Sequence, residues 1–245
     1  RFRTSNGTLA SLYKARLLKQ TLPIDSIVWK EPIERAGVPA VPGLDLIPSD
    51  VELMGIDLDL QSSAVRFQDL DRAARGYLAI RTMLRNAIAP LREQYDFILL
   101  DCPPNLYLVT QNALAASDAY VVTALPDHLS TVGLSMLNQR VGGLVNKLSA
   151  AAQIVGKTVN GCELGGILFV RVRIGGQSIL AMHRRIIEQI MRTYPGKAFP
   201  HYTIEGIGYG EAAEQALPVY LVESQNCRRV ASQYAEITND FVRRF

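Results

Sequence analysis

The feature that most constrains the fold of this chain is a set of short apolar runs that do not alternate with polar residues. These runs are rich in valine, isoleucine and leucine, and they are typical of parallel strands buried on both faces. Stretches with helical periodicity separate them, which predicts a three-layer α/β fold: a mostly parallel sheet with helices on both faces. The predicted strands are 43–49, 96–101, 119–126, 165–172 and, more weakly, 198–204.

Apolar residues recur every three or four positions in the intervals between these runs, and there we expect helices. The last of them, near the C-terminus, has a polar side of mixed charge. We therefore interpret its apolar stripe as facing the core and not a membrane surface. The predicted helices are 66–94 (ending near Pro90), 105–116, 129–150, 177–194 and 230–245.

The composition narrows the class of protein. Of the 245 residues 48% are hydrophobic and the mean hydropathy is +0.09, as in globular proteins. No apolar run reaches the roughly 18–20 residues of a membrane helix, so we expect no membrane partner. Cys102, Cys162 and Cys227 lie far apart without metal-ligand spacing. We interpret them as reduced thiols of a cytoplasmic protein and expect no metal site built from cysteine and histidine.

The positive charge is concentrated toward the C-terminus. The net charge is +3; residues 1–164 carry 16 basic and 16 acidic residues, whereas residues 165–245 carry 10 basic and 7 acidic residues. This excess is compatible with a weak anionic partner such as DNA, but charge alone favours the interpretation as an ordinary solvated surface.

Asp101 is the first candidate for a functional residue. It ends the apolar run 96–101 and is followed by Cys102, Pro103 and Pro104. A charge at the end of a buried strand is costly unless it is paired or faces a cation. Since ligands of parallel sheets bind at the carboxyl ends of the strands, Asp101 either faces a Mg²⁺-bound water there or marks the point where the strand reaches solvent.

Three segments resemble the ParA/MinD type of P-loop ATPases. The first, 95–137, contains the apolar run closing in Asp-Cys-Pro-Pro, the Thr-x-Asn-Ala-Leu of residues 110–114, and a strand ending in Pro126. The second, 204–224, has Glu-Ala ahead of Pro218, and the third is the strand and turn at 43–53. The three segments occur in the same order as in the family, and the resemblance covers roughly residues 8–244.

This resemblance implies a P-loop NTPase-like domain over residues 1–245 that binds ATP and Mg²⁺, forms a homodimer and positions or partitions DNA or other cargo. Asp101 would be the catalytic and metal-facing acid, and Pro126 and Asp127 would lie near the nucleotide. A ParB-like protein would stimulate hydrolysis, with nonspecific DNA as a further partner.

The chain departs from the family in three places. Many relatives carry Asp two residues before an arginine after the strand at 165–172, and here Arg171 stands in place of that acid, ahead of Arg173. The chain contains no glycine-rich phosphate loop followed by lysine and Ser/Thr: the nearest string, 151–158, follows a helix and not a strand. We therefore expect the strand–P-loop–helix–strand unit of the family to be missing from the N-terminus. The segment before Glu-Ala also lacks the arginines of DNA-binding relatives. Any DNA contact would fall on Arg171, Arg173, Arg184 and Arg185. Further basic side chains in this part of the chain are Arg192, Lys197, Arg228 and Arg229.

Two alternatives to an active ParA-like ATPase stay open at the level of sequence. One is a binding scaffold that keeps the fold without nucleotide, supported by the missing P-loop. The other is a different P-loop enzyme of the same superclass, such as an ATP-dependent synthetase or a metal-cluster carrier; the absence of paired cysteines speaks against the carrier.

Overall fold

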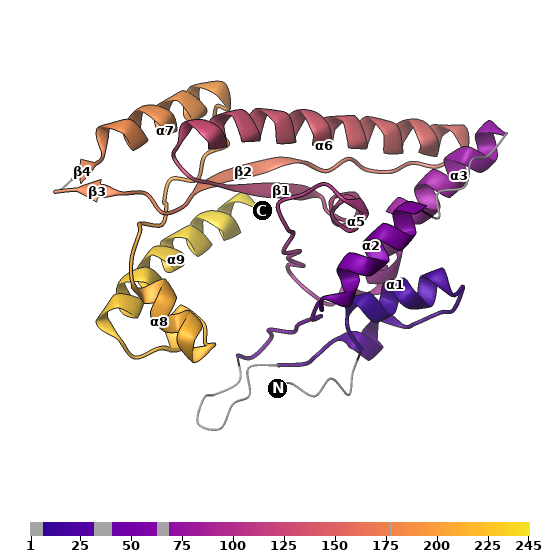
Figure 1. Cartoon of the computed structure of the whole chain (residues 1–245), viewed down its shortest axis with the longest axis horizontal. Helices are drawn as coiled ribbons and strands as arrows, with labels where there is room; N and C mark the ends of the chain where they lie inside the picture. The colour runs from indigo at the N-terminus through magenta and orange to yellow at the C-terminus, as the bar shows by residue number, and fades with distance from the viewer. Residues whose placement is uncertain (1–6, 32–40, 63–68, 177) are drawn as a thin grey trace. The chain divides into compact units, whose positions relative to one another are not determined.

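The computed structural model describes residues 7–31, 41–62, 69–176 and 178–245, and of residues 60–62 it describes only the backbone. The chain divides into two compact units: Arg1–Asp118 with Gly143–Cys162, and Ala119–Gly142 with Glu163–Phe245. Helix α6 contributes to both. Figure 1 labels the helices and strands of each unit.

The first unit is helical in its described residues. Its elements are α1 (Leu9–Leu17), η1 (Ile24–Ile27), α2 (Glu52–Ser62), α3 (Leu70–Arg81), α4 (Met83–Ile88), η2 (Ala89–Leu91), α5 (Leu108–Ala116) and the second half of α6 (His128–Ile154).

The second unit contains the parallel strands. Its elements are β1 (Ala119–Ala124), the first half of α6, β2 (Glu163–Phe169), β3 (Ile174–Gly175), β4 (Ser178–Ile179), α7 (Ala181–Thr193), α8 (Gly208–Gln215), η3 (Val219–Leu221) and α9 (Gln225–Arg244).

Strands β1 and β2 pair in parallel over their whole length, with one irregularity between Tyr120 and Val121. The segment after α7 continues this parallel arrangement, since Ala198 bridges Ile167 and Ile204 bridges Val172. The α/β class with a parallel sheet is thus confirmed, as are the strands predicted at 119–126 and 165–172. The run 198–204 runs parallel to β2 through these two bridges and is not a continuous strand.

Helices cover both sides of the β1–β2 ladder. Leu134 of α6 and Ile190 of α7 pack with Ile167 and Phe169 of β2 in one buried cluster. On the other side lies the C-terminal end of α9 (Figure 1). It approaches so closely that a Cβ atom added to Gly165 would lie 2.6 Å from the Phe245 ring. Glycine is therefore required there by the space between strand and helix.

Arg244 fastens α9 to the parallel segments. Its guanidinium donates hydrogen bonds to the carbonyl oxygens of Lys197 (2.6 Å) and Ala198 (3.0 Å) and stacks over the Phe199 ring, 4.4 Å from its centroid. Buried Val230 and Ile237 line the inner face of the same helix. The interpretation of the C-terminal stripe as core-facing is confirmed.

The strand predicted at 96–101 is wrong: the described backbone has no strand there. Ile98 and Leu100 pack on a core cluster of the first unit, while Phe97 and Leu99 are 42% and 75% exposed. A strand requires a neighbouring ladder, and a run of apolar residues does not supply one. For the same reason the strand predicted at 43–49 is reduced to a single antiparallel bridge between Leu46 and Trp29.

The single helix predicted over 66–94 is also wrong, and its described part breaks at Thr82 into α3 and α4 before η2 ends it at Leu91. Asn112, fully buried on α5, explains the break. Its Oδ1 accepts a hydrogen bond from the backbone N–H of Leu84 (3.2 Å), and its Nδ2 donates to the carbonyl of Ile80 (2.9 Å). The asparagine of the Thr-x-Asn-Ala-Leu motif thus joins α5 to both helices.

The other predicted helices are confirmed with shifted ends, as α5, α6, α7 and α9; residues 66–68 and 177 lie outside the described residues. The start of α7 moves to Ala181 because the hairpin of β3 and β4 occupies the preceding residues. Across the described ranges, no helix is both long enough and apolar enough to cross a membrane.

Ser224 offers a direct test of how α9 begins. Its Oγ accepts a hydrogen bond from the N–H of Cys227 (3.0 Å) and donates to Glu211 of α8. We expect Ser224→Ala to lower the free energy of unfolding by about 1 kcal/mol, the usual effect of losing an N-cap. Urea denaturation measures it. Ser232→Ala, on the exposed side of the same helix, is the matched control; equal losses in both variants would contradict the capping role.

Candidate functional site

Asp101 lies on an accessible loop of the first unit. Asp101, Cys102, Pro103 and Pro104 are all exposed, and no hydrogen bond or ion pair engages the Asp101 carboxylate within the part of the chain that the structure describes. The two prolines cannot donate backbone hydrogen bonds and restrict the chain. A free carboxylate on a stiff loop is suited to accept hydrogen bonds from a metal-bound water.

Side chains on both sides hold this loop in place. After it, Asn105 Oδ1 accepts a hydrogen bond from the N–H of Tyr107 (3.0 Å). Asp57 of α2, which is buried, accepts one from the N–H of Val109 (3.0 Å) at the start of α5. A carboxylate at a helix N-terminus is stabilised by the unpaired N–H groups and the helix dipole. The segment after Asp101 is therefore anchored to α2.

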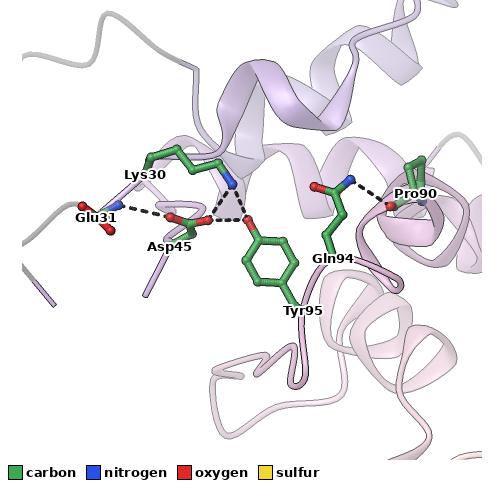
Figure 2. A network of polar contacts seen from close by, with 6 residues as sticks. All are labelled: Lys30, Glu31, Asp45, Pro90, Gln94 and Tyr95. Carbon is green, nitrogen blue, oxygen red and sulfur yellow. Dashed lines mark hydrogen bonds and ion pairs between the residues drawn. The ribbon is translucent and has the colours of Figure 1, made fainter. Parts of the chain in front are cut away.

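Before the loop, a polar network fixes the chain at Tyr95 (Figure 2). Lys30 Nζ lies 2.7 Å from Asp45 Oδ2 and 2.8 Å from the Tyr95 hydroxyl, which also donates to Asp45. The N–H of Glu31 donates to the other oxygen of Asp45 (3.1 Å). Hydrogen bonds from Lys30 and then from Tyr95 lower the pKa of Asp45, so this carboxylate is ionised at neutral pH.

Tyr13 lies completely buried on α1, in a cluster with Ile56 and Leu108. Its hydroxyl has no hydrogen-bond partner among the described residues. Burial raises the pKa of Tyr13 far above its ordinary value, and the negative charge of Asp57 and the thiol of Cys102 add to the effect. Tyr13 therefore stays neutral.

Cys102 carries the thiol next to Asp101. Cys102 is an exposed residue. The pKa of its thiol is nevertheless raised above the ordinary 9.0, mainly because the sulfur is partly shielded from water and also because of the negative charge of Asp101. The thiol is therefore protonated at neutral pH and a poor nucleophile.

Pro126 and Asp127 follow β1 in the second unit. Pro126 is fully buried, so its ring is packed in the protein. Asp127 precedes α6, and its Oδ1 accepts a hydrogen bond from the N–H of Ser130 (2.7 Å), which caps the helix. The structure thus gives both residues a structural role; their predicted place near a nucleotide stays a prediction.

Two of the four arginines predicted to bind DNA are held by an acid. Arg171 Nη2 and Arg173 Nε each lie 2.8 Å from a different oxygen of Glu205. Hydrogen bonds from these two guanidiniums lower the pKa of Glu205, which stays ionised and neutralises one of the two positive charges. Arg184 and Arg185 are exposed on α7, and no ion pair to a described residue engages them. Sequence reasoning missed Glu205, which lies more than thirty positions from its partners.

The Gly-Lys-Thr string at 156–158 is the end of a helix. Gly156 has a left-handed φ of 65°, and the N–H of Lys157 donates to the carbonyl of Ala152 (2.8 Å). This is the hydrogen-bond pattern of a helix C-terminus closed by glycine. The string is therefore no phosphate loop, and the four residues before Val155 belong to α6.

Comparison with known proteins identifies the family. A family model described as an AAA domain matches residues 4–154, more than half of the chain. The chain belongs to the ParA/MinD-type P-loop ATPases. It is 25% identical over 200 residues to the sporulation initiation inhibitor protein Soj of Bacillus subtilis, covering 82% of this chain and 67% of Soj. It is 30% identical over 144 residues to the chromosome partitioning protein ParA of Caulobacter vibrioides, covering 58% of this chain and 49% of that protein.

A solved structure agrees in fold. An ATP complex of a variant of McdA from Cyanothece superposes with a TM-score of 0.69 at 19% identity, covering 98% of this ParA-type chain and 77% of McdA. The chain spans about half to two thirds of the length of the curated relatives it matches.

The residues present fit ATP and Mg²⁺ only in part. Asp101 offers an accessible carboxylate of the kind that faces Mg²⁺ through water. The phosphate-holding loop of N–H groups and lysine is not found in this sequence. These residues therefore include an acid that could face the metal but no loop that binds the phosphates.

Cys102 reports the charge of Asp101 independently of any nucleotide. We expect Asp101→Asn to lower the pKa of the Cys102 thiol and so to speed its alkylation by iodoacetamide at about pH 8, because a negative charge beside the thiol is removed. Peptide mass spectrometry separates Cys102 from buried Cys162 and Cys227. Asp96→Asn, an exposed acid earlier on the same segment, should leave the rate unchanged. An unchanged rate in Asp101→Asn would contradict the coupling.

A substitution of Glu205 tests whether this acid masks the positive charge of Arg171 and Arg173. We expect Glu205→Gln to tighten binding to a duplex of about 30 base pairs at low salt and to steepen its salt dependence, because Arg171 and Arg173 lose the acid that neutralises them. Fluorescence anisotropy over a NaCl series measures both. Glu223→Gln changes the net charge equally without freeing either arginine. The same gain in both variants, or none in either, would contradict the proposed masking.

Proposed function

We propose that this chain acts in a ParA-like ATPase that dimerises with Mg-ATP and positions or partitions DNA or another cargo. Family membership supports the ATPase class, and the name of the chromosome partitioning protein ParA, to which the chain is similar, supports partitioning. The observation that carries the proposal is the accessible carboxylate of Asp101 on the loop of Asp-Cys-Pro-Pro, anchored on both sides by polar contacts.

In this proposal Asp101 is the acid that faces the metal. It would accept a hydrogen bond from a Mg²⁺-bound water, while the anchored loop keeps the carboxylate in one orientation. When bound, the nucleotide would supply the transferable phosphoryl group, and Mg²⁺ would supply positive charge to its phosphates. Pro126 and Asp127 would contribute through the backbone around the start of α6, because the Pro126 ring is buried and the Asp127 carboxylate already caps the helix.

The phosphate-binding loop belongs to the same proposal. Since these 245 residues lack it, we propose that a preceding strand–P-loop–helix–strand unit supplies it in the protein made by the cell. The intact mass of the native protein tests this point. A mass well above the 27.0 kDa of this chain, with a P-loop in the additional sequence, is the expected result; a mass of 27.0 kDa would overturn it.

The remaining parts of the proposal concern setting and partners. The protein would work in the cytoplasm, in keeping with three free cysteines, and a ParB-like protein would stimulate turnover. Nonspecific DNA would contact Arg184 and Arg185, which no acid in the described residues neutralises, in preference to Arg171 and Arg173.

A second candidate is a non-catalytic scaffold with the same fold, favoured by the absence of a P-loop from this sequence. The two functions differ in a measurable way. An ATPase switch shows a change in oligomeric state on adding Mg-ATP in analytical ultracentrifugation, whereas a scaffold shows the same sedimentation at every nucleotide concentration.

The role of Asp101 is tested in the full native protein. We expect Asp101→Asn to lower the rate of ATP hydrolysis about a hundredfold, because a preorganised charge in an active site is worth roughly that much, and to weaken the dependence on Mg²⁺. Steady-state phosphate release measures it. Asp96→Asn, which changes the same charge on the same segment, should retain wild-type turnover. Normal turnover in Asp101→Asn would remove Asp101 from the reaction.

A further inference from the structure

Helix α6 is held by two different hydrophobic clusters, one for each of its halves. It is continuous over its 27 residues, His128–Ile154 (Figure 1). In its first half Leu134 packs in the buried cluster of the β1–β2 ladder, in the second unit. In its second half Leu144 and Leu148 pack with Leu78 of α3, in the first unit. Each half of the helix is therefore fastened to its own unit.

The two units divide within this helix, between Gly142 and Gly143. Glycine weakens the interior of a helix more than any residue except proline, because its backbone has the most conformational freedom to lose. Close packing does not require glycine at either position. An added Cβ atom would meet no heavy atom of the described residues within 4 Å outside its own stretch of helix. In β2, by contrast, a Cβ atom added to Gly166 would lie 2.4 Å from the Phe199 ring.

The solvent side of α6 lacks supporting side chains at the same point. Gly142 is exposed and Gly143 is half-buried. Side chains four positions apart on a helix stabilise one another, and no side chain stands between exposed Asn138 and Asn146, because position 142 is glycine. Sharp bends in helices have few causes, and pairs of small residues such as these are one of them. The weakest point of α6 thus lies between the two clusters that hold it.

We propose that Gly142 and Gly143 form a hinge at which α6 bends, with each half staying packed in its own cluster. The bend opens backbone hydrogen bonds that span the glycine pair, while Leu134 and Leu144 remain buried. A few residues that absorb a change in backbone angles are enough for such a motion. This hinge goes beyond the proposed ATPase function and does not depend on nucleotide binding.

Double electron–electron resonance measures the bend along the helix itself. Spin labels are placed on Ser135→Cys and Gln153→Cys, two exposed positions on either side of the glycine pair. The full native protein carries Cys102→Ser in addition, because Cys162 and Cys227 are buried and Cys102 is exposed. The labelled positions are about 27 Å apart in a straight helix. We expect a broad distance distribution that extends to clearly shorter distances than this.

Replacing both glycines tests the cause of this breadth. Gly142→Ala combined with Gly143→Ala should narrow the distribution to one maximum at the length of a straight helix. Gly133→Ala is the matched control, since it also lies in α6 with open space around its Cβ position but outside the labelled interval. It should leave the width unchanged. Hydrogen exchange of the amides of 143–147 should slow about twentyfold in the double variant and stay unchanged in Gly133→Ala.

Three results would overturn the hinge. The first is a distribution for the unsubstituted helix that is already as narrow as that of the double variant. The second is equal narrowing by Gly133→Ala, which would indicate a general stiffening. The third is slower hydrogen exchange in the double variant without a change in the width, which would mean that the glycines weaken the helix but do not bend it. None of these measurements uses ATP, so failure of the ATPase proposal would not affect them.

Discussion

The parallel pairing of β1 and β2 is the constraint on which the rest of the second unit depends. Parallel strands cannot be joined by a short turn, so a helix must cross over between them, and α6 does this. The same direction is kept by 198–204 through its bridges to β2. As a result the carboxyl ends of all three segments lie at one edge of the sheet, and the residues that follow them include Asp127, Arg173 and Glu205.

At this edge, acidic side chains that stabilise the fold also reduce the charge that is left free to bind a ligand. Asp127 caps α6, and Glu205 neutralises part of the charge of Arg171 and Arg173. Arg171 has a left-handed φ of 54°, which a non-glycine residue adopts at some cost. Its N–H donates a hydrogen bond to Thr203 Oγ1 (3.1 Å). Asp101 in the first unit differs, because its carboxylate has no structural task in the described residues and stays available.

Much of the fold could be predicted from periodicity, and the failures have a common origin. Helices α5, α6, α7 and α9 and the strands β1 and β2 follow from local apolar spacing, whereas α1, α2 and α8 were not predicted. The strand expected at 96–101 does not form, because whether Phe97 and Leu99 are buried depends on a neighbouring strand that the pattern does not encode. The break at Thr82 depends on Asn112, which approaches from much later in the chain. The pairing of Glu205 with Arg171 and Arg173 was missed for the same reason.

The sequence alone determined the family, through Asp-Cys-Pro-Pro, Thr-x-Asn-Ala-Leu and the Glu-Ala segment, and it singled out Asp101. These conclusions rest on residues that are neighbours in the chain. Only the tertiary structure decided that Pro126 is buried, that Asn112 caps α4, and that Glu205 pairs with Arg171 and Arg173. Such relations join residues tens of positions apart. They arise from the parallel ladder and the packing of helices upon it, because hydrogen bonds and charge pairs act over a few ångströms of space whatever the separation in sequence.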